Sequence, residues 1–261
     1  MDLAGRRVLV TGASRGIGAE CVKAFAAAGA TVALAARTEG AIKELAAAVG
    51  GLAYPVDLAD GDQVDGFIAR VEQDGPLDVL VNNAGVETTT LFAELPEDEI
   101  TAVLTLNLMT PLRLTRQALP GMLERGRGHV VQVSSLAGVG QMPGAAVYGA
   151  SKAGLTHSAS TIEMELKGRG IGMTTVHLGP VETSMIDRAY AAEQFTAYWR
   201  RLHRLQLLTD VGPEIVARDI VEAVRKGKRF VLHPKRALMI HTLNDVPRRV
   251  LRLALAGIRY R

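Results

Sequence analysis

The sequence has a single cysteine, Cys21, among its 261 residues, so an internal disulfide is excluded. None of its six histidines stands at a recognised metal-ligand spacing from a cysteine, aspartate or glutamate. The single cysteine indicates a protein from a reducing compartment, and the lack of metal-ligand spacings predicts that no metal is bound. Aromatic residues make up only 4% of the chain, but hydrophobic residues make up 48%, which is enough for a large buried core.

Runs that suit a lipid bilayer are also missing. The stretch 130–151 carries no charge, but it contains glutamine, serine, proline and several glycines, which do not suit a lipid-facing helix. The first residues, MDLAGRRVLVTGASRG, place two arginines before a short apolar run that ends in a turn without a cleavage-like region. Because no export signal is evident, we expect a cytoplasmic protein.

The net charge is only +3, and the basic excess gathers near the end of the sequence. We interpret residues 234–261 as a basic C-terminal extension, for which three interpretations stay open. It forms an amphipathic helix on an anionic membrane, a helix docked on a partner subunit, or a loose terminus. Docking is favoured because the apolar residues form no clean stripe. We expect no nucleic-acid partner, since the segment lacks interleaved aromatic residues before Tyr260 and no reader motif appears.

Short apolar or β-branched runs alternate with longer stretches of helical periodicity. The runs are RRVLVTG, ATVALAAR, GGLAYPVDL, LDVLVNNAG, GHVVQVSS and GIGMTTVHLG, and most of them end in Gly, Asn, Ser or Asp. This alternation predicts an α/β fold, with a doubly wound parallel sheet and helices on both faces. Since no repeat, low-complexity linker or early composition break appears, we predict one domain over residues 1–261.

Three glycines, Gly12, Gly16 and Gly18, lie in the turn between the first predicted strand and its helix. Without Cβ atoms the backbone can approach a pyrophosphate, and the helix N-terminus offers free N–H groups and a positive dipole end. The spacing G-x-x-x-G-x-G differs from the better-known G-x-G-x-x-G, and alone it also fits an ordinary tight turn. Its position directly after the first strand favours a dinucleotide site.

These residues and the motifs after them resemble the short-chain dehydrogenase/reductase family. The motif Thr-Gly-xxx-Gly-Ile-Gly stands at residues 11–18, NNAG at 82–85 and Tyr-xxx-Lys at 148–152, and the resemblance covers roughly residues 5–185. It implies a Rossmann-type sheet of about seven strands and an oxidoreductase that acts on CH–OH groups. The cofactor contacts it implies are Gly12, Ser14, Arg15, Gly16, Ile17, Gly18, Arg37, Asp57, Leu58, Asn83, Ala84, Gly85, Tyr148, Lys152, Gly179, Val181 and Thr183.

The end of the second predicted strand indicates which cofactor binds. Enzymes that use NAD usually carry an acid there for the ribose 2′-hydroxyl, whereas the 2′-phosphate of NADP calls for arginine. This chain has Ala36 and then Arg37, and Arg15 in the glycine loop can approach the same phosphate from the other side. We therefore predict NADP(H). The alternative is that both arginines are solvated loop residues.

The tyrosine and the lysine of the last motif stand four residues apart, so on a helix they share a face. A carbonyl that receives hydride must gain a proton, and a nearby cation lowers the pKa of a phenol. The resemblance assigns Tyr148 as general acid/base and Lys152 as the cation that lowers its pKa and holds the nicotinamide ribose. It assigns Ser135 to the substrate carbonyl and Asn107 to a water in the proton path. The alternative is a purely structural role, in which Tyr148 packs as a helix residue and Lys152 extends its ammonium to solvent.

Two segments are expected to form the substrate pocket, 136–147 and a helical stretch over 183–210 that covers it. Their apolar and aromatic residues favour a hydrophobic ketone, aldehyde or alcohol as the substrate. The sequence departs from the family pattern just before the second segment, where many relatives have Pro-Gly and this chain has Leu178-Gly179.

A second hypothesis from another class is an NADPH-binding regulatory or scaffold protein without turnover. The presence of Tyr148, Lys152 and Ser135 argues for the enzyme instead. The resemblance also implies a homodimer or homotetramer, formed through the helices that contain Asn107 and Tyr148.

Overall fold

The computed structural model of the chain describes residues 1–140, 142–191, 200, 204 and 209–234. A seven-stranded sheet forms its centre, with the order β3-β2-β1-β4-β5-β6-β7 and parallel pairing throughout. The strands are β1 (Arg7–Thr11), β2 (Thr31–Ala36), β3 (Leu52–Pro55), β4 (Val79–Asn82), β5 (Gly128–Val133), β6 (Ile171–Leu178) and β7 (Phe230–His233). The predicted doubly wound parallel sheet is confirmed.

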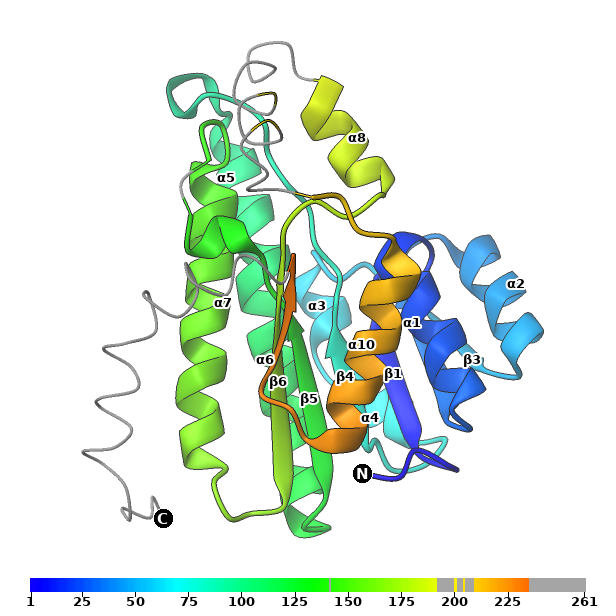
Figure 1. Ribbon diagram of the computed structural model, residues 1–261. Coiled ribbons are helices and arrows are strands. Elements are labelled where there is room, and N and C mark those ends of the chain that lie inside the picture. Colours follow the sequence, from blue (N-terminus) through cyan, green and yellow to red (C-terminus); the bar gives the residue numbers. More distant parts are fainter. Residues whose placement is uncertain (141, 192–199, 201–203, 205–208, 235–261) are drawn as a thin grey trace.

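Helices cover both faces of this sheet (Figure 1). One face carries α1 (Gly16–Ala27), α2 (Glu39–Val49) and α10 (Pro213–Lys226), and the other carries α4 (Phe67–Glu72), α6 (Thr110–Glu124) and α7 (Ala146–Glu165). Shorter elements are α3 (Gly61–Val64), η1 (Phe92–Glu94), α5 (Glu97–Leu104), η2 (Thr105–Met109), η3 (Leu136–Gly138) and α8 (Ser184–Ala191).

Side chains of each strand alternate between two buried apolar layers. In β1, Val8 and Val10 pack in the layer that contains Phe25 of α1, whereas Leu9 packs in the opposite layer with Phe67 of α4. A parallel sheet that is covered on both faces needs apolar residues at every position of its inner strands. This requirement explains why several of the strand runs, such as VLV in β1 and VALAA in β2, are apolar throughout rather than alternating.

The last strand, β7, is a short run that the sequence pattern does not separate from the basic end of the chain. It pairs with β6 from Thr175↔Phe230 to Leu178↔His233. Of the predicted extension 234–261 the structure describes Pro234, so its expected membrane or partner contact lies outside the described residues. Within the described ranges, no helix is long and apolar enough to cross a membrane.

The strand order reverses between β1 and β4, because the chain builds outward from β1 through β2 to β3 and then outward from β4 to β7. In open α/β sheets, the loops at the carboxyl ends of the strands diverge at such a point and leave a crevice. The fold therefore directs the glycine loop after β1 and the NNAG residues after β4 to the same crevice.

Candidate functional site

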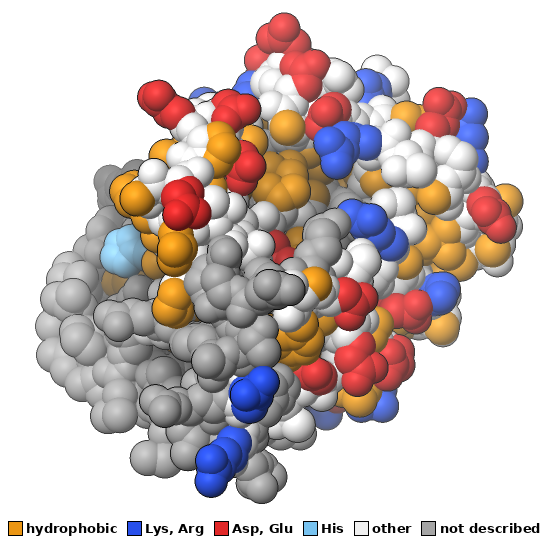
Figure 2. All heavy atoms as spheres, turned by 90° about the horizontal axis from the view of Figure 1, so that it is seen from above, with side chains coloured by type: hydrophobic (Ala, Val, Ile, Leu, Met, Phe, Trp, Pro, Cys, Tyr) orange, Lys and Arg blue, Asp and Glu red, His pale blue; other side chains and the backbone are white. Residues whose placement is uncertain are grey.

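A cavity of about 1180 Å³ opens at the carboxyl edge of the sheet. Seen from above, this edge shows a hollow with hydrophobic side chains inside and charged side chains around its rim (Figure 2). Two of the predicted site residues, Gly18 and Asn107, are buried outside the lining. The others all line the cavity, namely Gly12, Ser14, Arg15, Gly16, Ile17, Arg37, Asp57, Leu58, Asn83, Ala84, Gly85, Ser135, Tyr148, Lys152, Gly179, Val181 and Thr183.

The glycine loop is packed so closely that its glycines cannot be replaced without a shift. A Cβ on Gly18 would lie 2.1 Å from the Gly12 carbonyl oxygen, and a Cβ on Gly12, where φ is +65°, would lie 2.9 Å from Ala84 Cα. Helix α1 begins at Gly16, and its N-cap residue Arg15 makes no side-chain cap. The first backbone N–H groups of α1 are therefore available to an anionic group in the cavity.

One hydroxyl ties this loop to the NNAG segment. Thr11 Oγ1 accepts hydrogen bonds from the backbone N–H groups of Asn83 (2.9 Å) and Ala84 (3.0 Å), and it donates to the Val81 carbonyl at 3.2 Å. Asn83 Nδ2 in turn donates to the Thr11 carbonyl at 2.9 Å. The ends of β1 and β4 are thus held in one arrangement, which shapes the floor of the cavity.

At the far end of the glycine loop, Arg15 and Arg37 are both exposed and both line the cavity. Ala36 stands directly before Arg37, at the strand end where an acid would bind a ribose 2′-hydroxyl. Among the described residues, no carboxylate forms a salt bridge with either arginine. Two such guanidinium groups suit a phosphate dianion.

Tyr148 and Lys152 lie on one face of α7, as their spacing predicts, with Lys152 Nζ 5.8 Å from the centre of the Tyr148 ring. Burial raises the pKa of Tyr148 to about 12, a hydrogen bond with Ser135 lowers it, and the charge of Glu87 raises it further. The direction is opposite to the depression we expected from Lys152. The buried ammonium donates to the Val133 carbonyl at 2.9 Å, and burial lowers the pKa of Lys152 to about 8. The loss of solvation of the phenolate is the main cause of the raised pKa of Tyr148.

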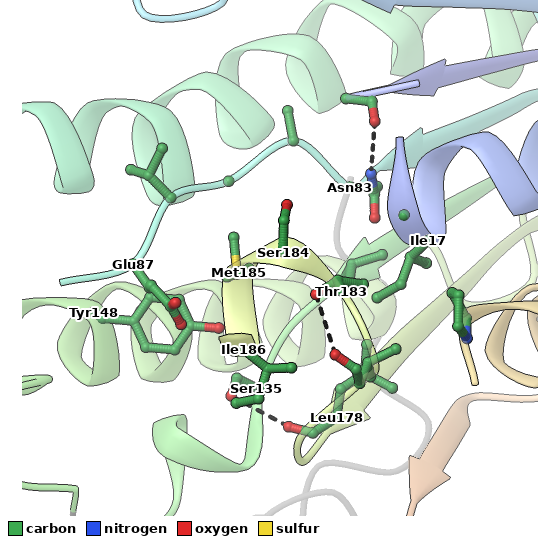
Figure 3. A pocket seen from close by; sticks show the side chains of 18 of the residues that line it. Ile17, Asn83, Glu87, Ser135, Tyr148, Leu178, Thr183, Ser184, Met185 and Ile186 are labelled. Carbon is green, nitrogen blue, oxygen red and sulfur yellow. Dashed lines mark hydrogen bonds between the residues drawn. The ribbon is translucent and has the colours of Figure 1, made fainter. Parts of the chain in front are cut away.

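The two serines after β5 have different surroundings. Ser135 donates to the Leu178 carbonyl at 3.2 Å, and its hydroxyl lies close enough to Tyr148 for a hydrogen bond between the two side chains (Figure 3). Ser134 bonds to the Lys152 carbonyl at 3.1 Å and to Thr156 Oγ1 at 2.7 Å, so its hydroxyl is used to hold α7 against the sheet. Ser135 is therefore the better placed of the two for a substrate carbonyl.

Asn107 sits in the π-helical turn η2 and is completely buried. Its Oδ1 accepts from the Val86 N–H at 2.9 Å, and its Nδ2 donates to the Val86 carbonyl at 2.7 Å and to Ser151 Oγ at 3.2 Å. The side-chain amide is thus occupied in holding the loop after β4. The expected contact of Asn107 with a water in a proton path stays a prediction.

The loop after β6 closes the cavity from the side opposite to β4. The Gly179 N–H donates to the His233 carbonyl at 2.7 Å, and Thr183 Oγ1 donates to the Val181 carbonyl at 3.1 Å. A Cβ on Gly16 would come within 3.2 Å of Thr183 Cγ2, so this loop lies against the glycine loop. With Leu178 before Gly179 in place of the expected family proline, Val181 and Thr183 still lie in the cavity wall.

Sequence reasoning missed Glu87 and Ile186, whereas Met185 in the segment 183–210 was expected to contribute to the substrate pocket. Glu87 lines the cavity beside Tyr148, and Met185 and Ile186 of α8 also line it (Figure 3). The signal for Glu87 was its place directly after NNAGV, at the end of a strand, but a charge there is also typical of a solvated loop. The expected cover over 183–210 includes α8, whereas its residues 192–199, 201–203 and 205–208 lie outside the described ranges.

Comparisons with known proteins agree with this geometry. The family model described as short chain dehydrogenase matches residues 6–194. The ketoacyl reductase HetN of Nostoc sp. is 34% identical over 236 residues, a match that spans 88% of this chain and 79% of HetN. In some longer relatives, the matched region makes up 18% or 40% of the protein.

Two solved structures are also similar. A short-chain dehydrogenase from Streptomyces avermitilis superposes with a TM-score of 0.80 and 31% identity, and the match covers 98% of this chain and 97% of that one. A metagenomic short-chain oxidoreductase in complex with NADP has a TM-score of 0.71 and 29% identity, with coverage of 88% and 96%.

Proposed function

Since the chain belongs to the short-chain dehydrogenase family, we propose that it is an NADP(H)-dependent oxidoreductase that interconverts a hydrophobic ketone or aldehyde and the corresponding alcohol. One observation carries the proposal. The Tyr148 and Ser135 hydroxyls and the buried Lys152 ammonium converge on the cavity that the glycine loop also lines. An acid, a hydrogen-bond donor and a cation at one point suit proton transfer to a carbonyl oxygen that gains negative charge.

In the reductive direction, Tyr148 donates the proton. With its pKa raised to about 12, the phenol of Tyr148 is protonated at neutral pH and so holds the proton to be donated. Because a raised pKa also makes the phenol a weaker acid, the transfer depends on stabilisation of the tyrosinate. Ser135 donates a second hydrogen bond to the same carbonyl oxygen and orients it. Lys152 lies 5.8 Å from the Tyr148 ring and stabilises the tyrosinate that remains after proton transfer. When bound, the nicotinamide cofactor supplies or accepts the hydride.

The residues that would hold NADP(H) form a continuous track along the cavity. The first N–H groups of α1 and the bare Cα atoms of Gly12 and Gly16 suit the pyrophosphate, and Arg15 and Arg37 suit the 2′-phosphate. By the family resemblance, Asp57 and Leu58 flank the adenine, Asn83, Ala84 and Gly85 line its ribose, and Val181 and Thr183 meet the carboxamide. The NADP complex of the metagenomic relative supports this choice of cofactor.

The substrate end of the cavity supports a hydrophobic carbonyl compound. Apolar side chains line it from three segments, with Leu136 and Val139 after β5, Met142 before α7, and Met185 and Ile186 on α8. Burying such a lining against an apolar substrate is favourable by about 25 cal/mol per Å². The name of HetN, a ketoacyl reductase, supports an acyl ketone as one member of this class.

We also propose a homodimer or homotetramer that forms through the helices containing Asn107 and Tyr148. A groove of about 310 Å³ between α6 and α7 supports this assembly, since Leu112, Leu119, Leu123 and Ile162 line it. Covering these apolar side chains with a second subunit removes them from water and so stabilises the assembly.

A spectrophotometric screen of NADPH consumption across carbonyl compounds tests the function. The wild type should oxidise NADPH with hydrophobic ketones, and Tyr148→Phe should lose turnover by at least about 100-fold because general-acid catalysis contributes this much. NADPH binding, measured by fluorescence titration, should persist in the variant. Appreciable turnover by Tyr148→Phe would overturn the role of the tyrosine. A wild type that binds NADPH but reduces no carbonyl compound would favour the regulatory or scaffold protein.

A further inference from the structure

Helix α8 stands above the carboxyl edge of the sheet, outside the two helix layers that cover its faces (Figure 1). Three of its apolar side chains line the cavity, those of Met185, Ile186 and Ala189. Figure 3 shows the first two among the side chains of the cavity wall. Because they suit the hydrophobic body of a substrate, the position of α8 decides how much of that body is buried.

The loop after β6 fixes the N-terminal end of α8. Thr183 Oγ1 donates to the Val181 carbonyl at 3.1 Å, and the Asp187 N–H donates to the Thr183 carbonyl at 3.2 Å. The helix has 8 residues, and with a rise of about 1.5 Å per residue its other end lies roughly 10 Å beyond this attachment. An attachment at that end as well defines the position of the whole helix.

A hydrogen bond between Tyr190 and Asp210 supplies this second attachment. The Tyr190 hydroxyl, in the last turn of α8, donates to Asp210 Oδ1 at 2.6 Å across 20 positions of the sequence. Burial and the hydrogen bond to Asp210 raise the pKa of Tyr190 above its usual value, so the hydroxyl stays protonated and remains the donor. A hydrogen bond in which the acceptor is charged is stronger than one between two neutral groups.

Asp210 belongs to a segment that is itself joined to the sheet. The next residue, Val211, forms a parallel bridge with Val181, and its N–H donates to the Pro180 carbonyl at 3.3 Å. Helix α10 follows directly, and its buried face packs in the core on one side of the sheet. The hydrogen bond from Tyr190 therefore ties the end of α8 to the central scaffold of the molecule.

We propose that Tyr190 and Asp210 are positioning residues, whose hydrogen bond holds α8 over the hydrophobic body of the substrate and so favours long apolar substrates over short ones. Neither residue belongs to the described lining of the cavity, so both act through Met185 and Ile186 rather than by touching the substrate. This inference rests on the proposed carbonyl reduction, and it adds the length of the apolar body as the property that is selected. Proton donation by Tyr148 is unchanged.

Butanone and 2-octanone test the proposal, because both are methyl ketones and they differ in the length of the alkyl chain. We would measure kcat and KM for each ketone at saturating NADPH, and NADPH affinity by fluorescence titration. The variants are Tyr190→Phe, which removes only the hydroxyl, Asp210→Ala, the double variant, and Asp210→Asn, which keeps an acceptor oxygen without the charge. Tyr54→Phe is the matched control, since the Tyr54 hydroxyl also donates to a carboxylate, that of Asp74, but lies outside the cavity lining.

The wild type should prefer 2-octanone in kcat/KM by at least about 10-fold, since each fully buried methylene contributes about 4-fold. Tyr190→Phe should raise KM for 2-octanone by about 5- to 10-fold, because a hydrogen bond to a charged group no longer holds the binding conformation. Its KM for butanone and its NADPH affinity should change by less than about 2-fold. Asp210→Ala and the double variant should match Tyr190→Phe, Asp210→Asn should fall between them and the wild type, and Tyr54→Phe should keep the wild-type values.

Two results would overturn the inference and leave carbonyl reduction intact. One is a KM that is unchanged in Tyr190→Phe or that changes equally for both ketones. The other is a double variant in which the effects of Tyr190→Phe and Asp210→Ala add, because two partners of one hydrogen bond cannot lose it twice. If the wild type binds NADPH but oxidises it with neither ketone, the proposed function fails and the inference fails with it.

Discussion

The Thr11 hydroxyl allows a direct test of what holds the floor of the cavity together. Thr11 Oγ1 is buried and accepts from two backbone N–H groups, those of Asn83 and Ala84, at 2.9 and 3.0 Å. Replacing Thr11 with Val keeps the shape and the β-branched side chain but removes the acceptor, so two donors lose their partner at once. A partly buried donor without a partner costs about 1–3 kcal/mol, and because both N–H groups are half-buried we expect a total of about 2–4 kcal/mol.

Thr11→Ser is the matched control because it keeps the hydroxyl and removes one buried methyl group, at a cost of about 1 kcal/mol. Urea unfolding followed by far-UV circular dichroism would give the change in unfolding free energy for both variants, and fluorescence titration would give their affinity for NADPH. Thr11→Val should be less stable than Thr11→Ser and should bind NADPH more weakly, since Asn83 and Ala84 also line the cavity. If Thr11→Ser were the less stable of the two, this account of the cavity floor would be refuted.

Three further predictions concern the cofactor and stability. Arg37→Asp should weaken NADPH binding by at least about 10-fold and shift preference toward NADH in fluorescence titrations, because it replaces a phosphate partner with a ribose-hydroxyl partner. Gly18→Ala should weaken NADPH binding strongly, since its Cβ would lie 2.1 Å from the Gly12 carbonyl oxygen, whereas Gly40→Ala, with nothing within 4 Å, should not. Burial lowers the pKa of His129 from 6.5 to about 4. Only the unfolded chain protonates this imidazole in that interval, so stability should fall by up to about 3 kcal/mol as pH drops through it, and His129→Gln should show a shallower fall in urea unfolding.

For each of these three predictions, one result would contradict the structural reasoning. An unchanged cofactor preference in Arg37→Asp would mean that the 2′-phosphate lies elsewhere. Normal NADPH affinity in Gly18→Ala would mean that the glycine loop can relax. Parallel pH profiles of unfolding for wild type and His129→Gln would mean that His129 can take up a proton in the folded state.

The pattern of local spacings was enough to predict the main parts of the site. The glycine loop, the NNAG segment and the Tyr148–Lys152 pair depend on contacts between near neighbours and on the ends of parallel strands, which meet at one edge of the sheet. The direction of the Tyr148 pKa could not be predicted in this way. It depends on burial and on Glu87, a residue from a different strand end, and neither follows from the spacing of a helix. Asn107 is similar, because its bonds to Val86 join two segments 21 residues apart.

The sequence by itself determined the first six strands and the helical stretches between them, the family and the residues able to take part in the chemistry, because periodicity and short motifs are encoded within a few residues of each other. Only the tertiary structure decided which charges meet. It turned Lys152 toward the Val133 carbonyl, placed Arg15 and Arg37 in the wall of the same cavity and brought Glu87 near Tyr148. The physical reason is that electrostatic free energy depends on distance and burial, and both are set by how segments far apart in the chain pack against one sheet.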